Sequence, residues 1–164
     1  MSSLYLTAVI LFIGIIALSR VLRRKRNPFT HGSHLPYSRR PLMTTSELQA
    51  YDVLLEALPN HMVFPQVQVS RVLAVPKNKE TYYWFNFISR LSYDFVVCRP
   101  DGTPLAAIEI DDASHQLPER QEADNRKNKA TESAGVVMLR WSVDTIPDTR
   151  DIQRLIKRID QQAD

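Results

Sequence analysis

An uncharged apolar run near the N-terminus constrains this chain more than any other feature. Leu4–Ser19 (LYLTAVILFIGIIALS) holds no charged residue, and the apolar character resumes for two residues after Arg20. A membrane-spanning helix needs about 20 such residues, or fewer where a terminal arginine reaches the lipid headgroups. The positive cluster RVLRRKR follows the run, whereas a cleavable signal peptide carries its charge before the apolar segment. The sequence therefore predicts a transmembrane anchor over residues 1–22, with a basic flank to residue 26.

The position of this basic flank also predicts an orientation. Lys and Arg are enriched on the cytoplasmic side of membrane helices, so we expect the N-terminus outside and the rest of the chain in the cytoplasm. This gives a single-pass protein of the inner (cytoplasmic) membrane. The alternative is a buried core helix, and the basic flank argues against it. Residues 27–43, with three prolines and no amphipathic period, are expected to form a linker.

Charge divides the chain into two unlike parts. Residues 1–43 carry seven Lys and Arg and no acidic residue, whereas residues 44–164 carry fourteen basic and eighteen acidic residues, a net charge of −4. The sequence pI of about 9.1 therefore comes from the N-terminal part. A hydrophobic fraction of 44% allows a buried core in residues 44–164, and a single cysteine excludes a disulfide scaffold.

Residues 44–164 alternate helical and strand patterns, which predicts one α/β domain. We expect helices at 44–58, 117–134 and 148–159, and strands at 62–75, 93–98, 104–111 and 136–141. The segment 81–89 fits either a short helix or a strand. Thr44 and Glu47 have the spacing of a capping box at the first helix. Because a helix separates the last two strands, that pair is expected to be parallel in a mixed sheet flanked by helices.

Three carboxylates lie in the two strands joined by the turn at 99–103. Asp94 is surrounded by apolar residues, and Glu109 and Asp111 are two apart, so that they face one side of a strand. Asp94 and Glu109 lie about equally far from the turn, so antiparallel pairing brings them together. An unpaired carboxylate buried in such a sheet costs several kcal/mol, a cost that a divalent cation would offset.

Oxygen ligands without a cysteine or histidine set suit Mg²⁺ or Mn²⁺, and such a site can hydrolyse phosphodiester bonds. The alternatives are structural. A single aspartate in a strand is often an ion-pair or edge residue, and Glu-x-Asp can simply mark the solvated end of a strand.

The pattern also resembles a known group of enzymes. The matching stretches are Ser46-Glu47, FPQVQVSRVL at 64–73, SYDFVVC at 92–98, PLAAIEIDDASH at 104–115, Gln121, Asp124 and Lys127, and AGVVMLRW at 134–141. Together they resemble the PD-(D/E)XK superfamily, which has the restriction-endonuclease-like fold. More narrowly, they resemble the domain-of-unknown-function family 2726. The resemblance covers about residues 44–142 and implies a nuclease that depends on Mg²⁺ or Mn²⁺.

This resemblance implies roles for individual residues. Asp94 takes the place of the motif aspartate and Glu109 that of the acidic residue in (D/E)XK. The carbonyl of Ile110 would be a further metal ligand, and Glu47 resembles the acidic residue that many members carry on the first helix. These four residues form the expected metal set, with Asp94 and Glu109 also expected to be catalytic.

The sequence departs from the superfamily pattern at the motif lysine. Asp111 stands where the lysine is expected, and related branches often have an acidic residue there. Lys127 is the best replacement lysine, and Lys129 is the alternative. Asp111, Lys127 and His115 complete the candidate catalytic set, although His115 fits a turn histidine equally well. Gln66 and Gln121 are weaker candidates for polar support.

An aromatic run at 82–87 (YYWFNF) could stack on nucleic-acid bases, but the pattern is more typical of core residues. Cys98 is expected to be a small buried residue of a strand, and Trp141 to serve in packing.

Three functions remain open. The first is a membrane-anchored, divalent-metal-dependent nuclease, with DNA favoured over RNA as its substrate. The second is a catalytically inactive module with the nuclease fold that binds nucleic acid or a protein partner at the membrane, because the motif lysine is missing. The third is a membrane-bound scaffold for a protein partner.

Overall fold

The computed structural model describes residues 5, 7, 9–16, 29, 34–111 and 118–163, with the backbone alone for 118–120. Its contacts divide the chain into two units, Met1–Arg40 and Pro41–Asp164. In the first unit, residues 9–16 are helical. Among the described residues no helix combines the length and apolar character needed to cross a membrane. The predicted anchor over residues 1–22 lies largely outside the described residues and stays a prediction.

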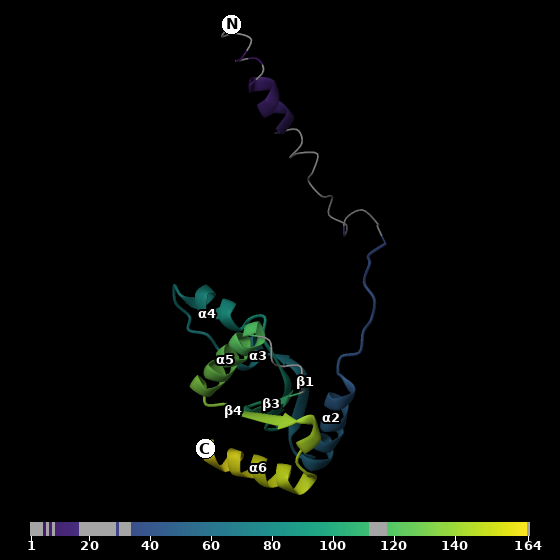
Figure 1. Ribbon diagram of the computed structural model, residues 1–164. Coiled ribbons are helices and arrows are strands. Elements are labelled where there is room, and N and C mark those ends of the chain that lie inside the picture. The colour runs from purple at the N-terminus through teal and green to yellow at the C-terminus, as the bar shows by residue number, and fades with distance from the viewer. Residues whose placement is uncertain are drawn as a thin grey trace. The chain divides into compact units, whose positions relative to one another are not determined.

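The second unit is built on a four-stranded mixed sheet (Figure 1). Its strands are β1 (Met62–Gln68), β2 (Ser92–Cys98), β3 (Pro104–Asp111) and β4 (Val137–Ser142), and they lie in chain order. The first three pair antiparallel, and β3 pairs with β4 in parallel. The predicted hairpin and the predicted parallel last pair are therefore confirmed. Pro65 lies on the edge strand β1, where its missing N–H is tolerated.

Helices cover both faces of this sheet. They are α2 (Thr45–Ala57), α3 (Val69–Val72), α4 (Thr81–Ile88), α5 (Pro118–Ser133) and α6 (Thr149–Gln162), with a short 3₁₀ turn at Val143–Thr145. Thr44 caps α2 through the predicted capping box with Glu47, and Asp148 caps α6 by accepting the N–H of Asp151.

Two apolar clusters fill the space between the helices and the sheet. In the first, Leu54 of α2 and Ile156 of α6 pack against Phe95 and Ile108 of the central strands. In the second, Val69, Ile88 and Ala130 from α3, α4 and α5 pack against residues of β2 and β3. The result is a three-layer α/β/α arrangement, which agrees with the predicted mixed sheet flanked by helices.

The strand predicted over 62–75 ends earlier than expected. Gln66 has a left-handed φ of +53° and is skipped between the pairs Pro65–Phe95 and Val67–Tyr93. After Gln68 the chain turns into α3, and the Val69 N–H donates to the Leu91 carbonyl at 2.9 Å. The β-branched residues at 69–75 therefore cover the second apolar cluster instead of extending the sheet, and the strand prediction was wrong for that part.

The aromatic segment 81–89, for which the sequence allowed either a short helix or a strand, forms helix α4. The expectation that its rings belong to the core was wrong, because Ile88 is the buried residue of α4 and the rings at 82–85 and 87 are exposed. An eight-residue helix that is apolar all round can bury only one side. The expected packing roles of Cys98 and Trp141 are confirmed, since both are buried.

Replacing Ile156 by alanine should destabilise the domain. Ile156 is fully buried between α6 and the sheet, so the cavity and the lost burial should lower the free energy of unfolding by about 2–5 kcal/mol. Urea unfolding of the full chain in mild detergent, followed by circular dichroism, measures this change. The exposed neighbour Lys157 is the matched control, and Lys157→Ala should change it by less than about 0.5 kcal/mol. Equal effects of the two substitutions would contradict this packing.

Candidate functional site

The register of β2 and β3 brings Asp94 and Glu109 together. Phe95 pairs with Ile108, so one step further along the antiparallel register places Asp94 opposite Glu109. The Ile110 N–H donates to Asp94 Oδ2 at 2.8 Å, which fixes the aspartate against β3. The expected convergence of these two carboxylates is therefore observed.

Glu109 lies in the interior of the domain, with 6% of its surface exposed. Lys127 Nζ donates to Glu109 Oε2 at 2.6 Å, which forms a buried ion pair. The other oxygen, Oε1, is buried and has no hydrogen-bond partner. A buried acceptor without a donor costs free energy, so this oxygen is available to a ligand that can approach it.

Lys127 is held in place from several directions. Its Nζ also donates to the Ser92 carbonyl at 3.1 Å and lies 3.7 Å from Asp124 Oδ1. The Thr131 hydroxyl donates to the Lys127 carbonyl at 2.6 Å and shares a 2.6 Å hydrogen bond with the Tyr93 hydroxyl. Burial raises the pKa of Tyr93, so this phenol stays neutral. The network pins α5 to β2 and points its lysine at Glu109.

Glu47 reaches the same region from the start of α2. The Thr44 N–H donates to Glu47 Oε2 at 2.5 Å, and the Gln66 side-chain amide donates to Oε1 at 3.0 Å. The unusual backbone of Gln66 thus occurs where its side chain meets Glu47. Glu47 also lies near enough to Asp94 for its charge and a side-chain hydrogen bond to raise the pKa of the Asp94 carboxyl.

Burial raises the pKa of both central carboxyls. For Asp94, desolvation is the largest cause and the Ile110 N–H opposes it; the charge of Glu47 raises the pKa further, and Lys127 lowers it. For Glu109, desolvation raises the pKa to about 7 against the opposing effect of Lys127, and Asp94 adds to the rise. Both shifts mean that burial opposes the charged carboxylates, and a bound cation would offset that cost.

Asp111 pairs with an arginine of the neighbouring strand. Arg140 Nη1 donates to Asp111 Oδ1 at 2.9 Å, and its Nη2 donates to Asn128 at 3.1 Å and lies 3.7 Å from Asp124. Arg140 comes from β4, whose parallel register sets it beside Glu109. Asp111 therefore takes part in an ion-pair network at the edge of the site.

The donor chemistry fits a hard divalent cation held by few side chains. Among the described residues, no group of three or more His, Cys, Asp or Glu side chains is placed to hold a metal ion. Asp94 and the unpartnered Oε1 of Glu109 supply two carboxylates on neighbouring strands. Mg²⁺ commonly keeps several waters and takes one or two protein carboxylates, so such a pair is sufficient.

The remaining predicted residues do not all lie at the candidate site. His115 lies outside the described residues, so its predicted role stays a prediction. Lys127, and not Lys129, meets Glu109; Lys129 lies on the exposed side of α5. Gln66 binds Glu47, as its supporting role requires, whereas Gln121 is exposed.

Sequence reasoning missed the pairing of Arg140 with Asp111 and the role of Thr131. Parallel alignment of IEID at 108–111 with LRWS at 139–142 would have found the first. No sequence motif could have identified Thr131, because its hydroxyl contacts the backbone carbonyl of Lys127, and such a contact needs no particular residue pattern.

Comparison with known proteins gives one match. Residues 39–161 match the family model described as "Protein of unknown function (DUF2726)". This match confirms the narrower of the two resemblances predicted from the sequence. No curated protein and no solved structure matches the chain.

The raised pKa of Glu109 predicts a pH-dependent stability. Because this pKa rises from 4.5 to about 7 on folding, the folded domain keeps a proton that the unfolded chain loses. The free energy of unfolding should therefore fall as pH rises through this window, by up to about 3 kcal/mol. Glu109→Gln removes this contribution. The loss of its ion-pair partner lowers the stability of the variant at every pH, but the difference between the unfolding free energies of variant and wild type should shift in favour of the variant from about pH 5 to about pH 8, as measured by urea unfolding in EDTA.

Glu132→Gln, on the exposed side of α5, is the matched control and should leave the pH dependence as it is. Identical pH profiles for wild type and Glu109→Gln would show that Glu109 does not titrate in this window.

Proposed function

This chain belongs to the DUF2726 family of proteins of unknown function, and we propose that its folded domain is a divalent-metal-dependent nuclease. The reaction is hydrolysis of phosphodiester bonds in DNA or RNA, with DNA the preferred substrate. The proposal includes the PD-(D/E)XK fold relationship predicted from the sequence. One observation carries it: a buried glutamate with one unpartnered oxygen lies between an aspartate and a lysine.

The residues proposed to hold the metal are Asp94, Glu109 and the Ile110 carbonyl, with Glu47 beside Asp94. A bound Mg²⁺ or Mn²⁺ would polarise the scissile phosphate and supply an activated water. Asp94 and Glu109 would hold the metal across two neighbouring strands, since each is itself fixed by a contact to β3 or α5. Glu47 would add an oxygen beside Asp94 from the side of α2, and the metal would offset the repulsion between the two carboxylates.

Lys127 is the proposed cation of the reaction. Its ammonium donates hydrogen bonds to Glu109 and to the Ser92 carbonyl, so these contacts hold the otherwise flexible lysine side chain in one position. From there it can orient the attacking water and stabilise the charge that develops on the phosphate. The Asp111–Arg140 pair would lie at the periphery of the site. His115 is the proposed acid or base of the reaction, or a contact to phosphate.

The second candidate is an inactive module with the same fold that binds nucleic acid or a protein partner at the membrane. It is favoured by Asp111, which stands at the motif lysine position and is neutralised by Arg140. Such a module would bind its partner without metal and would tolerate Lys127→Ala. The nuclease is preferred because the inactive module gives no use to the unpartnered oxygen of Glu109.

We further propose that the uncharged N-terminal run anchors the nuclease in the inner membrane, as a single span with the domain in the cytoplasm. The support is the sequence itself, an apolar segment followed by RVLRRKR and a proline-containing linker. The anchor would confine cleavage to nucleic acid at the membrane surface.

Nuclease activity should require both metal and the acidic pair. We expect the full chain in mild detergent to cleave labelled DNA in Mg²⁺ or Mn²⁺ and not in EDTA. Asp94→Asn, Glu109→Gln and Lys127→Met should each lower the rate by about a hundredfold or more, because each removes a metal ligand or the stabilising charge. Gel assays on single-stranded DNA, duplex DNA and RNA measure this.

Glu132→Gln is the matched control for these variants and should cleave at the wild-type rate. Calorimetric titration of Mn²⁺ gives an independent readout: saturable binding in the wild type should be lost in Asp94→Asn. Cleavage that survives Asp94→Asn, or the absence of both cleavage and Mn²⁺ binding, would reject the nuclease proposal.

The anchor is tested by extraction. The full chain should stay with the membrane fraction after alkaline carbonate washing, whereas Ile10→Arg with Ile13→Arg should release it. Each arginine at the centre of a span costs about 3 kcal/mol on insertion scales. Leu42→Arg, in the predicted linker, is the control and should not release the chain. A wild-type chain extracted by carbonate would overturn the anchor.

A further inference from the structure

Helix α4 presents a cluster of aromatic rings to solvent. Tyr83 packs edge-on against Trp84 and Phe87, with ring centroids 5.2 and 4.9 Å apart. Trp84 nevertheless remains 46% exposed and Tyr82, on the same helix, 76% exposed. Soluble domains seldom leave so many large rings together at the surface, and such a patch commonly marks a binding site.

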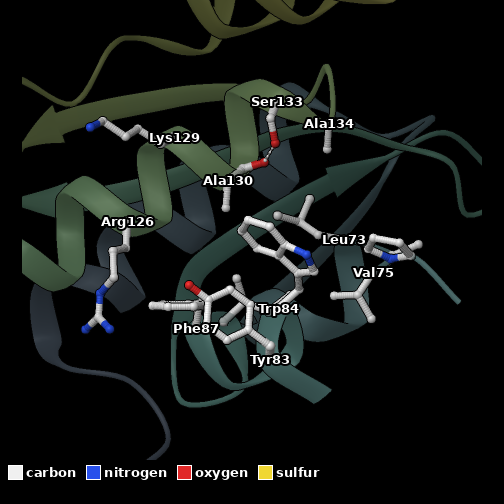
Figure 2. Close-up of a pocket in the computed structure, with 13 residues that line it drawn as sticks. Leu73, Val75, Tyr83, Trp84, Phe87, Arg126, Lys129, Ala130, Ser133 and Ala134 are labelled. Carbon is white, nitrogen blue, oxygen red and sulfur yellow. Dashed lines mark hydrogen bonds between the residues drawn. The ribbon is translucent and has the colours of Figure 1, made fainter. Parts of the chain in front are cut away.

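These rings form one wall of a pocket of about 440 Å³ (Figure 2). Figure 2 shows Tyr83, Trp84 and Phe87 on one side of it and α5 on the other, with the Arg126 side chain running toward the level of Phe87 and the Lys129 side chain extending away from the rings. The base of the pocket is apolar. Its volume lies within the range of small-molecule sites, so it can accept one or more planar rings.

A second pocket, of about 410 Å³, adjoins the first and shares two of its residues, Phe87 and Arg126. It is lined in addition by Tyr82 and by Arg90, which follows the end of α4. We call the two pockets together the α4–α5 groove.

The charge of the groove is opposite to that of the domain. The described residues that line it include Arg90, Arg126 and Lys129 and no Asp or Glu. Residues 44–164 have a net charge of −4, so a purely basic lining is a local departure. Charge complementarity therefore points to an anionic ligand, and the rings point to one that also carries flat aromatic groups.

The groove and the candidate site share two segments of the chain. Arg126, which lines both pockets, directly precedes Lys127 on α5, although the exposed Arg126 and the buried Lys127 lie on different sides of the helix. Leu91 lines the second pocket and precedes Ser92, whose carbonyl accepts the Lys127 ammonium.

We propose that the α4–α5 groove binds single-stranded nucleic acid. Bases stack on Tyr83, Trp84 and Phe87, and Arg90, Arg126 and Lys129 contact the phosphates. Stacking of this kind needs bases that are not paired, so the groove selects single strands or unpaired segments without a sequence preference. The inference rests on the proposed nuclease function and names its substrate class. A membrane surface is disfavoured, because the rings line a hollow shared with cations.

The test is binding in EDTA, where cleavage is absent. The full chain in mild detergent is titrated with a fluorescent oligothymidine of about 20 nucleotides and with a duplex of the same length. The wild type should prefer the single strand. Trp84→Ala should weaken single-strand binding by about tenfold, whereas Trp84→Phe, which keeps a ring, should restore most of it. Arg126→Ala should weaken binding and reduce the slope of log affinity against log salt by about 0.7.

Matched controls separate the groove from the rest of the surface. Phe64, an exposed ring on β1, and Arg158, an exposed cation on α6, lie elsewhere, and Phe64→Ala and Arg158→Ala should bind as wild type. The basic flank at 20–26 adds the same background to every variant. Asp94→Asn should keep oligonucleotide binding and lose cleavage, so failure of the nuclease proposal is seen separately from failure of the groove.

Several outcomes would overturn the inference. Wild-type affinity in both Trp84→Ala and Arg126→Ala would do so, as would the absence of oligonucleotide binding by the wild type or an equal preference for duplex. Loss of binding to anionic phosphatidylglycerol vesicles in the same variants, with oligonucleotide binding unchanged, would identify the groove as a membrane-contact surface instead.

Discussion

A buried ion pair between Lys127 and Glu109 connects α5 to the centre of the sheet, and the candidate site depends on it. Burying two charges costs several kcal/mol each, and removal of either partner leaves an uncompensated charge that costs about 3–5 kcal/mol. The Ser92 carbonyl and the Thr131–Tyr93 network offset part of this cost by fixing the lysine. One oxygen of Glu109 still has no hydrogen-bond donor, so the cost of burying this carboxylate is only partly offset. The same oxygen is therefore left to accept a ligand.

The cation that meets the buried glutamate comes from a helix and not from the strand of the glutamate itself. Two residues after Glu109 the strand carries another acid, Asp111, and Arg140 on the neighbouring strand neutralises it. The cation that faces Glu109 comes instead from α5, eighteen residues after the glutamate. The electrostatic requirement of the site is a positive charge within hydrogen-bond distance of the buried glutamate, and a helix packed on the sheet supplies it as directly as the strand would.

The same separation between sequence and space applies to the net charge. A domain with a net charge of −4 looks unsuited to nucleic acid, yet its acidic residues are distributed unevenly. Several lie in or beside the candidate metal site, where a cation would neutralise them, and the described lining of the α4–α5 groove contains none. The charges close to a surface patch, and not the net charge of the domain, therefore decide whether a polyanion can bind there. Exposed charges more than about 10 Å away from the patch are largely screened by salt.

The sequence by itself determined the mixed sheet with its hairpin and parallel last pair, the capping box at Thr44 and the convergence of Asp94 with Glu109. These follow from period, turn residues and distance from the turn, which are local properties. Tertiary structure alone decided that Arg140 pairs with Asp111, that the Gln66 side chain meets Glu47, and that the rings of α4 stay outside the core. Those outcomes depend on which side of each helix the rest of the chain can cover. A short helix that is apolar all round gives no periodic signal to say which of its faces will be buried.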